Sequence, residues 1–200
     1  RDIGPVDTQM PQERPFTDPT SVWFVIQRHT IIKLSAEIYD VTESASAPSA
    51  EIISELAARL EVAIDNIPKW MRYESLEASI TEDSAILSHR IFLDILIHKA
   101  VYLLHRRSFM KGYSAEQSVN SNQRCIDAAL AILEHQRRMK EETQPGGLLF
   151  GSRWKISASR NHEFLQATMM LCYALSRLEE GCDGGRNEDS IYRKDDILMA

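Results

Sequence analysis

The sequence contains few cysteines, and none of them stands in a pattern that binds metal or builds a disulfide framework. Only Cys125, Cys172 and Cys182 occur among 200 residues. No two of them form a CxxC pair, and none is grouped with histidines at zinc-binding spacing. An odd, widely spaced set of this kind favours a reducing compartment. The sequence therefore predicts neither disulfide stabilisation nor a cysteine-ligated zinc site in this chain.

Basic residues are also outnumbered by acidic ones. The chain has 23 lysines and arginines against 29 aspartates and glutamates, which gives a formal net charge of -6. A module that binds nucleic acid through its own surface is normally basic, because neutralised phosphates supply most of the affinity. We therefore expect no direct nucleic acid contact from this chain.

A hydrophobic run long enough to cross a membrane is missing as well. The most apolar stretch, IFLDILIHKAVYLL, is interrupted by Asp94, His98 and Lys99 and is shorter than the roughly 20 residues of a spanning helix. No signal-peptide pattern precedes it, so we expect no membrane partner. The chain starts at Arg1 without a methionine and stops in RKDDILMA, which is typical of a helix start. We expect a segment of a longer protein.

Hydrophobic residues make up 44% of the chain, and many of them recur at helical spacing. Their periodicity predicts five helices: from a cap at Asp18 or Thr20 to about Asp40, from a cap at Ser49 to a stop before Pro68, from Thr81 to Arg107, from about Ala115 to Glu142, and from about Ser159 to Glu180. The third is apolar on nearly every side and should be central. No segment alternates like a strand.

The predicted fold class is therefore all-α, a multi-helix bundle or array. A helical domain spans 20–180. It follows an irregular, proline-containing lead-in segment at 1–19, where each proline biases its predecessor away from the helical region. It precedes a flexible acidic, glycine-containing link at 181–200 that includes the start of a further helix.

Two short segments resemble metal-binding motifs but are incomplete. NHEFLQA resembles the zinc-protease helix motif, in which two histidines four residues apart bind the metal, but Gln166 replaces the second histidine. We interpret His162 and Glu163 as ordinary residues of a helix's first turn. The pair Asp195 and Asp196 is similar to the acidic clamps of helical terpene cyclases, but lacks the further carboxylate one turn on. We interpret that pair as helix caps or solvated residues.

The cysteines are not expected to act as nucleophiles, because none has a neighbouring histidine or a glycine-rich elbow in sequence. Cys125 and Cys172 fall on apolar helix faces and are predicted to be small buried hydrophobes. Cys182 falls in the exposed link. The sequence thus predicts no catalytic, cofactor-binding or metal-binding residue, and no enzyme.

The basic trio in LLHRRSFMKGYS allows two interpretations. His105, Arg106 and Arg107 could bind an anion such as phosphate, since guanidinium groups pair well with it. Alternatively they cap the bare carbonyls at the end of their helix while Phe109 folds back on the core. The similar ending HQRRMK in the next helix favours the helix terminus.

Five segments match a known family in order. They are MPQERPFTDPTSVWFVIQRHTIIKLSAEIYD, AIDNIPKWMRY, LLHRRSFMKGYS, SNQRCIDAALAILEHQ and HEFLQATMMLCYAL, with matching positions at Pro11, Arg14, Pro15, Thr20, Phe24, Ile26, Lys33, Leu34, Ser121, Cys125, Ala128 and Ala129. Together they resemble the later part of the fungal-specific transcription factor domain over about residues 8–178. Two departures are that Trp70 follows Pro68 instead of preceding it, and that Arg107 or Ser108 replaces a proline.

The resemblance implies the middle homology region of a fungal binuclear zinc-cluster transcription factor, a nuclear regulator of transcription without catalytic activity. In that family a separate N-terminal cluster of six cysteines reads DNA and holds zinc, so we expect no cofactor in this chain. Expected partners are the remainder of the regulator, a second copy or transcription machinery, and a small-molecule effector. The matched positions carry packing, so no site residue is transferred. A helical ligand-binding or enzymatic protein and a plain dimerisation scaffold remain the alternatives.

Overall fold

The computed structural model describes residues 21–111, 115–156 and 161–181, and these form an array of helices. The helices are α1 (Ser21–Thr42), α2 (Ala50–Asp65), α3 (Ser84–Lys111), α4 (Ala115–Glu142), α5 (Arg153–Ile156) and α6 (Asn161–Gly181), with 3-10 turns at Lys69–Met71, Glu77–Ser79 and Phe150–Ser152. No strand occurs in these ranges, so the predicted all-α fold is confirmed. The predicted lead-in segment 1–19 and all of the link beyond Gly181 lie outside the described residues.

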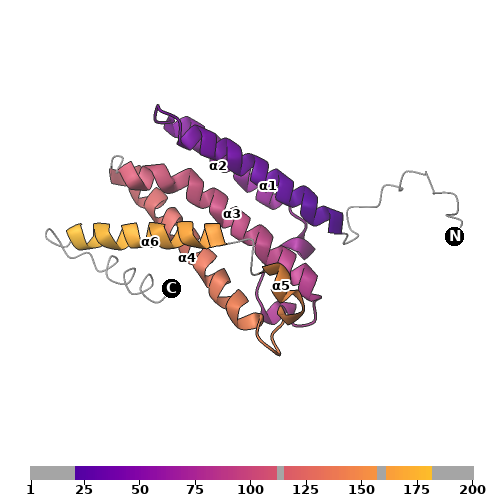
Figure 1. Cartoon of the computed structure of the whole chain (residues 1–200). Coiled ribbons are helices and arrows are strands. Elements are labelled where there is room, and N and C mark those ends of the chain that lie inside the picture. Colours follow the sequence, from indigo (N-terminus) through magenta and orange to yellow (C-terminus); the bar gives the residue numbers. More distant parts are fainter. Residues whose placement is uncertain (1–20, 112–114, 157–160, 182–200) are drawn as a thin grey trace, which may run out of the picture.

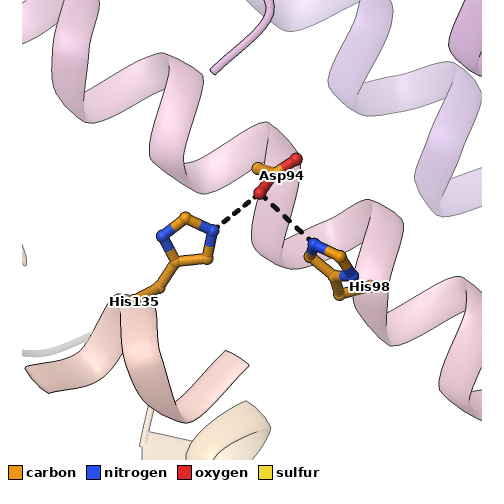
Figure 2. Close-up of side chains that lie close together, drawn as sticks. All are labelled: Asp94, His98 and His135. Atoms are coloured by element: carbon orange, nitrogen blue, oxygen red, sulfur yellow. Dashed lines mark hydrogen bonds and ion pairs between the residues drawn. The ribbon is translucent and has the colours of Figure 1, made fainter. Parts of the chain in front are cut away.

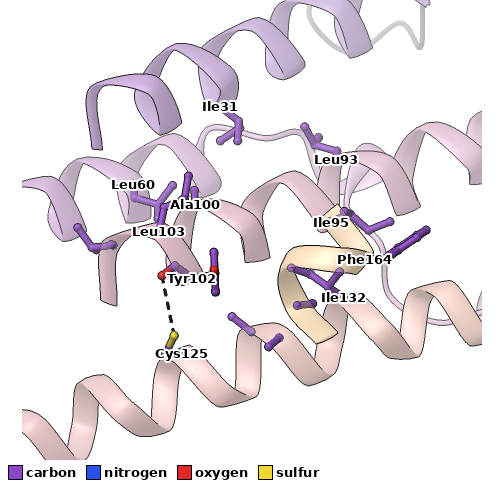
Figure 3. Close-up of a cluster of buried hydrophobic side chains, with 14 of the residues drawn as sticks. Ile31, Leu60, Leu93, Ile95, Ala100, Tyr102, Leu103, Cys125, Ile132 and Phe164 are labelled. Carbon is purple, nitrogen blue, oxygen red and sulfur yellow. Dashed lines mark hydrogen bonds between the residues drawn. The ribbon is translucent and has the colours of Figure 1, made fainter. Parts of the chain in front are cut away.

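Helix α3 occupies the centre of the array, as its all-round hydrophobicity predicts. It packs against α1 and α2 on one side and against α4 on the other, and α6 packs on α4 (Figure 1). Leu93 lies towards Ile31 of α1, whereas Ile95 lies towards Ile132 of α4 and Phe164 of α6 (Figure 3). All but Phe164 are at most 2% exposed. Because burying one such side chain contributes about 1.5–3 kcal/mol, packing on both faces of α3 holds the array together.

Helix α2 starts where the sequence predicts. The backbone N–H of Ile52 donates to the hydroxyl oxygen of Ser49 at 3.4 Å, which makes Ser49 the N-cap residue. At the other end Asn66 is the C-cap, and Pro68 follows two residues later. Both ends of this helix therefore follow from local chemistry.

Replacing Ser49 with alanine should lower the free energy of unfolding by about 0.5–1 kcal/mol, because the N–H of Ile52 loses its acceptor. Urea denaturation of the 200-residue chain would measure this. Ser46→Ala changes an exposed serine of the same loop and serves as the control. Equal losses for the two variants would contradict the capping role of Ser49.

The bounds of α3 differ from the prediction at both ends. It starts at Ser84, not Thr81, because the carboxylate of Asp83 accepts from the N–H of Ala85 at 2.7 Å and so caps the helix from outside. It continues beyond Arg107 to Lys111, because Phe109 in the additional turn is buried. The basic trio therefore lies inside the helix. None of the described helices combines the length and hydropathy that crossing a bilayer requires.

Candidate functional site

The two arginines of the basic trio contact the end of α1. One terminal nitrogen of Arg107 donates to the carbonyl oxygens of Thr42 at 2.5 Å and of Ser44 at 2.6 Å. Arg106 forms an ion pair with Glu43. The last turn of α1 contains no basic residue of its own, so Arg107 supplies the positive charge that a helix C-terminus favours.

The predicted capping role is therefore confirmed for Arg107, but the prediction named the wrong helix end. Arg107 caps the carbonyls of α1, which no sequence pattern within α3 indicates. An open hollow of about 670 Å³ lies beside Arg106, Arg107 and Met110. Because both guanidinium groups already bind groups of this chain, the hollow is a poor site for an additional anion.

The third member of the trio, His105, does not cap any helix. Its side chain is buried, and neither ring nitrogen has a hydrogen-bond partner within 21–111, 115–156 and 161–181. Burial, together with the positive charge of Arg124, lowers the pKa of His105 to about 4. Phe109 does fold back on the core, where its ring meets that of Tyr173 edge-on at 5.7 Å.

The segment that resembles the zinc-protease motif lies in the first turns of α6. His162 is exposed, whereas Glu163 accepts a hydrogen bond from the ammonium group of Lys99 on α3 at 3.0 Å. Gln166 is partly buried. Glu163 therefore joins α6 to α3. Asp195 and Asp196 lie outside the described residues.

The two described cysteines differ in their burial. Cys125 is fully buried on α4, with its sulfur 4.0 Å from the carbonyl oxygen of Tyr102 (Figure 3). Burial raises the pKa of its thiol to about 12, so it stays protonated and weakly nucleophilic at neutral pH. Cys172 is exposed, which makes the prediction of burial wrong. The reason is that α6 buries a different stripe, formed by Phe164, Ala167, Met170, Leu171 and Ala174. Cys182 lies outside the described residues.

One group of side chains comes together that the sequence analysis did not predict. Asp94 and His98 lie four residues apart on α3, and His135 projects towards them from α4 (Figure 2). One oxygen of Asp94 lies 2.6 Å from Nε2 of His135 and 3.4 Å from Nε2 of His98. One donor atom from each residue lies within 4.8 Å of the other two. We call Asp94, His98 and His135 the Asp–His–His cluster.

The Asp–His–His cluster is mostly sheltered from solvent. The side chain of His135 is 7% exposed, that of Asp94 25% and that of His98 32%. Burial by itself raises the pKa of Asp94, but the hydrogen bonds from His135 and His98 outweigh it and hold that pKa well below its usual range. Asp94 is therefore an anion at neutral pH.

An aromatic ring packs against the Asp–His–His cluster, and a cavity borders it. The ring of Tyr73 meets the ring of His135 edge-on at 4.9 Å. A cavity of about 140 Å³ is lined by Asp94, Tyr73 and Ile97, among others. The Nδ1 atom of His135 is buried and has no hydrogen-bond partner among the described residues.

Only part of this cluster could have been found in the sequence. The spacing of Asp94 and His98 places both on one side of any helix, since residues four apart share a face. His135 is 41 residues beyond Asp94 and joins them only because α3 packs against α4. A pair of possible ligands on one helix is common and does not by itself indicate a site.

The chain is similar to fungal transcription factors over most of its length. It is 35% identical over 167 residues to the Zn(2)-C6 fungal-type transcription factor mpsB of Macrophomina phaseolina, which is 84% of this chain and 23% of the relative. It is 31% identical over 196 residues to the transcription factor phm2 of a Pyrenochaetopsis species, which is 98% of this chain and 26% of the relative.

A third curated relative is the pyrrolocin cluster transcription factor fsdR of a fungal species, with 30% identity over 186 residues, 92% of this chain and 24% of the relative. The chain spans about a quarter of the length of these relatives. No family model matches the chain. No solved structure matches it either.

Proposed function

We propose that this chain is a non-catalytic regulatory segment of a fungal transcription regulator that acts in the nucleus. The observation that supports this most strongly is the similarity to fungal transcription factors over 84%, 98% and 92% of the chain. We assign the segment to the fungal-specific transcription factor domain, because the five ordered segments of the sequence resemble the later part of that domain. The matched positions are packing positions. In this proposal the helical array as a whole, and not a single site, therefore carries the regulatory role.

In this proposal DNA is read by a zinc cluster elsewhere in the regulator. The described cysteines do not fit such a cluster, because Cys125 is enclosed in the core and Cys172 is on the surface of another helix. The contacts of the basic side chains also favour DNA reading by another part of the regulator. Arg106 and Arg107 bind the end of α1, and Arg137 and Arg138 both pair with Glu134. These four arginines are therefore occupied by groups of this chain, and the acidic net charge also disfavours phosphate binding.

The first partner in this proposal is the remainder of the regulator. Several large apolar side chains are exposed on α6 and α1, which lie on different sides of the array (Figure 1). On α6 Leu165 is 62% exposed and Met169 72%, and on α1 Val22 and Val25 are each 60% exposed. Exposed apolar patches on outer helices are suited to covering by other protein, from the same regulator, a second copy or the transcription machinery.

The alternative that the chain binds a small effector gains less support. The cavity beside Asp94, at about 140 Å³, is smaller than the roughly 300–1,000 Å³ of typical ligand pockets. The larger hollow at Arg106 and Arg107 is open, and both arginines are already paired with groups of this chain. An effector that bound this chain alone would therefore occupy an open hollow, such as this one or the hollow of about 350 Å³ beside Arg137 and Arg138.

The proposal predicts that disrupting the helical core in the full-length regulator abolishes regulated transcription and leaves DNA binding intact. Leu104 is 2% exposed, so Leu104→Asp places a charge in the core and should unfold this segment. Transcripts of the regulated genes should fall to the level of a deletion strain, while gel-shift affinity for the DNA site should stay within about twofold of wild type. Quantitative transcript measurement and gel shift check the two parts separately.

Val62→Asp is the matched control, since the same change at a 60% exposed position should alter neither readout. Loss of DNA binding in Leu104→Asp would contradict the separation of functions. A reading frame that starts near Arg1, without six upstream cysteines at zinc-cluster spacing, would contradict the proposed class. So would measured turnover of a substrate by the purified chain.

A further inference from the structure

The Asp–His–His cluster has the composition of a transition-metal site. Imidazole nitrogen suits zinc, copper, iron and nickel, and a carboxylate oxygen completes a set that also binds zinc readily. Three protein ligands plus a water or another group is the usual arrangement of zinc sites that keep an open position. We propose that Asp94, His98 and His135 bind one late first-row divalent cation, with Zn²⁺ as the preferred ion.

The donor atoms already lie near the spacing that such an ion requires. In a tetrahedral zinc site with bonds of about 2.0–2.1 Å, neighbouring donor atoms are about 3.3 Å apart. The oxygen of Asp94 and Nε2 of His98 are separated by 3.4 Å, which is long for a hydrogen bond and close to that value. The 2.6 Å contact between Asp94 and His135 must lengthen by less than about 1 Å, which side-chain rotation can supply.

Rigid elements hold the three ligands in place. Asp94 and His98 are one helical turn apart on α3, so their side chains project from the same face. His135 lies within the long helix α4, which packs along α3, and the ring of Tyr73 packs against its imidazole. The site therefore needs no loop to order before an ion binds.

The burial and direction of His135 also fit a ligand role. Its imidazole is more than nine-tenths buried, and its Nε2 atom is directed at Asp94 (Figure 2). The other ring nitrogen, Nδ1, faces away from the cluster and has no hydrogen-bond partner within the described ranges (Figure 2). In metal sites this second nitrogen usually donates to a carboxylate, a carbonyl or water, so a water molecule beside Nδ1 is expected to complete the site.

The surroundings allow an ion to enter and to complete its coordination. Asp94 borders the cavity of about 140 Å³, which has room for a water molecule as a further ligand. Arg72 and Arg90 also line this cavity, but both are held elsewhere. Arg72 donates to the carbonyl oxygen of Ile67, and Arg90 pairs with Glu82 at 3.0 Å. The charge of Asp94 therefore stays available to a cation.

Metal binding at this position would join α3 to α4 at the centre of the array. An ion that binds the folded chain and not the unfolded chain stabilises the fold by mass action. The expected ligand set excludes Mg²⁺ and Ca²⁺, which prefer oxygen donors. This metal site is separate from any six-cysteine cluster in the regulator, and it departs from the sequence prediction that the chain binds no metal.

The test is a titration of the purified, chelator-treated 200-residue chain with ZnCl₂, followed by calorimetry and thermal denaturation. Cys172 and Cys182 are replaced by serine so that their thiols do not bind zinc. We expect one Zn²⁺ per chain and a rise in Tm on binding. His98→Ala and His135→Ala should each weaken binding by at least about 100-fold, since losing even a supporting group of a metal site costs 10–100-fold.

Two exposed histidines provide matched controls, because His29→Ala and His162→Ala should leave the affinity unchanged. Circular dichroism checks that each variant folds, and His98→Gln or His135→Gln replaces the corresponding alanine variant if that variant does not fold. A tetrahedral Co²⁺ spectrum that disappears in His98→Gln would support the same ligands. Absence of binding at about 1 mM Zn²⁺ would overturn the proposal. So would binding that is unaffected by changes at His98 and His135.

Discussion

Replacing Arg107 with alanine is expected to lower the free energy of unfolding by about 2–3 kcal/mol. One nitrogen of its guanidinium group donates to the carbonyl oxygens of Thr42 and Ser44 at 2.5 and 2.6 Å. A hydrogen bond from a charged donor is worth about 1.5–3 kcal/mol, and Arg107 is partly exposed, which reduces the sum. Thr42 is 1% exposed, so water cannot readily replace the lost donor. Urea denaturation at neutral pH measures the change.

Two further variants separate this contact from a general loss of charge. Arg137→Ala removes an exposed arginine that pairs with Glu134 and Glu141, and it should leave stability nearly unchanged because solvent screens such pairs. Arg107→Lys keeps the charge near the end of α1 and should recover about half of the loss by donating to one carbonyl. A loss in Arg107→Ala no greater than in Arg137→Ala would contradict the capping of α1 from α3.

The second large effect is a loss of stability in acid caused by His105. Burial and the charge of Arg124 lower the pKa of His105 from its ordinary value of 6.5 to about 4 in the folded chain. The unfolded chain therefore binds the proton more tightly. Stability from this group is complete above pH 6.5 and is lost as pH falls from 6.5 towards 4. The loss reaches about 2.5–3 kcal/mol near pH 4.5.

Urea denaturation of wild type and His105→Leu at a series of pH values from 7.5 to 4.5 tests this. His105→Leu should be at least as stable as wild type at pH 7.5, because it removes two buried nitrogens without partners in the described part. Its stability should fall less steeply, since the carboxylates that titrate are shared by both proteins. His29→Leu changes an exposed histidine and should follow wild type. Parallel curves for His105→Leu and wild type would contradict a neutral, buried His105.

The helices that the sequence predicts most accurately are those whose ends have local signals. Helix α4 has the predicted bounds Ala115–Glu142, because its apolar residues repeat until the glycine-containing segment that follows. Helix α2 starts after Ser49 because the hydroxyl oxygen of this cap and the N–H donor of Ile52 lie three residues apart. Such signals act within one turn and are therefore visible in a single stretch of sequence.

Errors occur where distant segments determine the outcome. Helix α3 passes beyond Arg107 because Phe109 packs against Tyr173, which lies 64 residues later. The short helix α5 was not predicted at all, since four residues carry too little periodicity. Cys172 was placed on the wrong side of α6, because Leu165 and Met169 form a second apolar stripe that competes with the buried one.

By itself, the sequence determined that the chain is helical, which apolar side chains recur at helical spacing, and that its charge does not suit DNA binding. Only the tertiary structure decided which helix end Arg107 caps, which face of α6 is buried, and that His135 meets Asp94 and His98. The physical reason is the separation along the sequence over which each interaction acts. Periodicity and capping act over three or four neighbouring residues, whereas a side chain's final partner depends on how whole helices pack, and that depends on the free energy of the complete core.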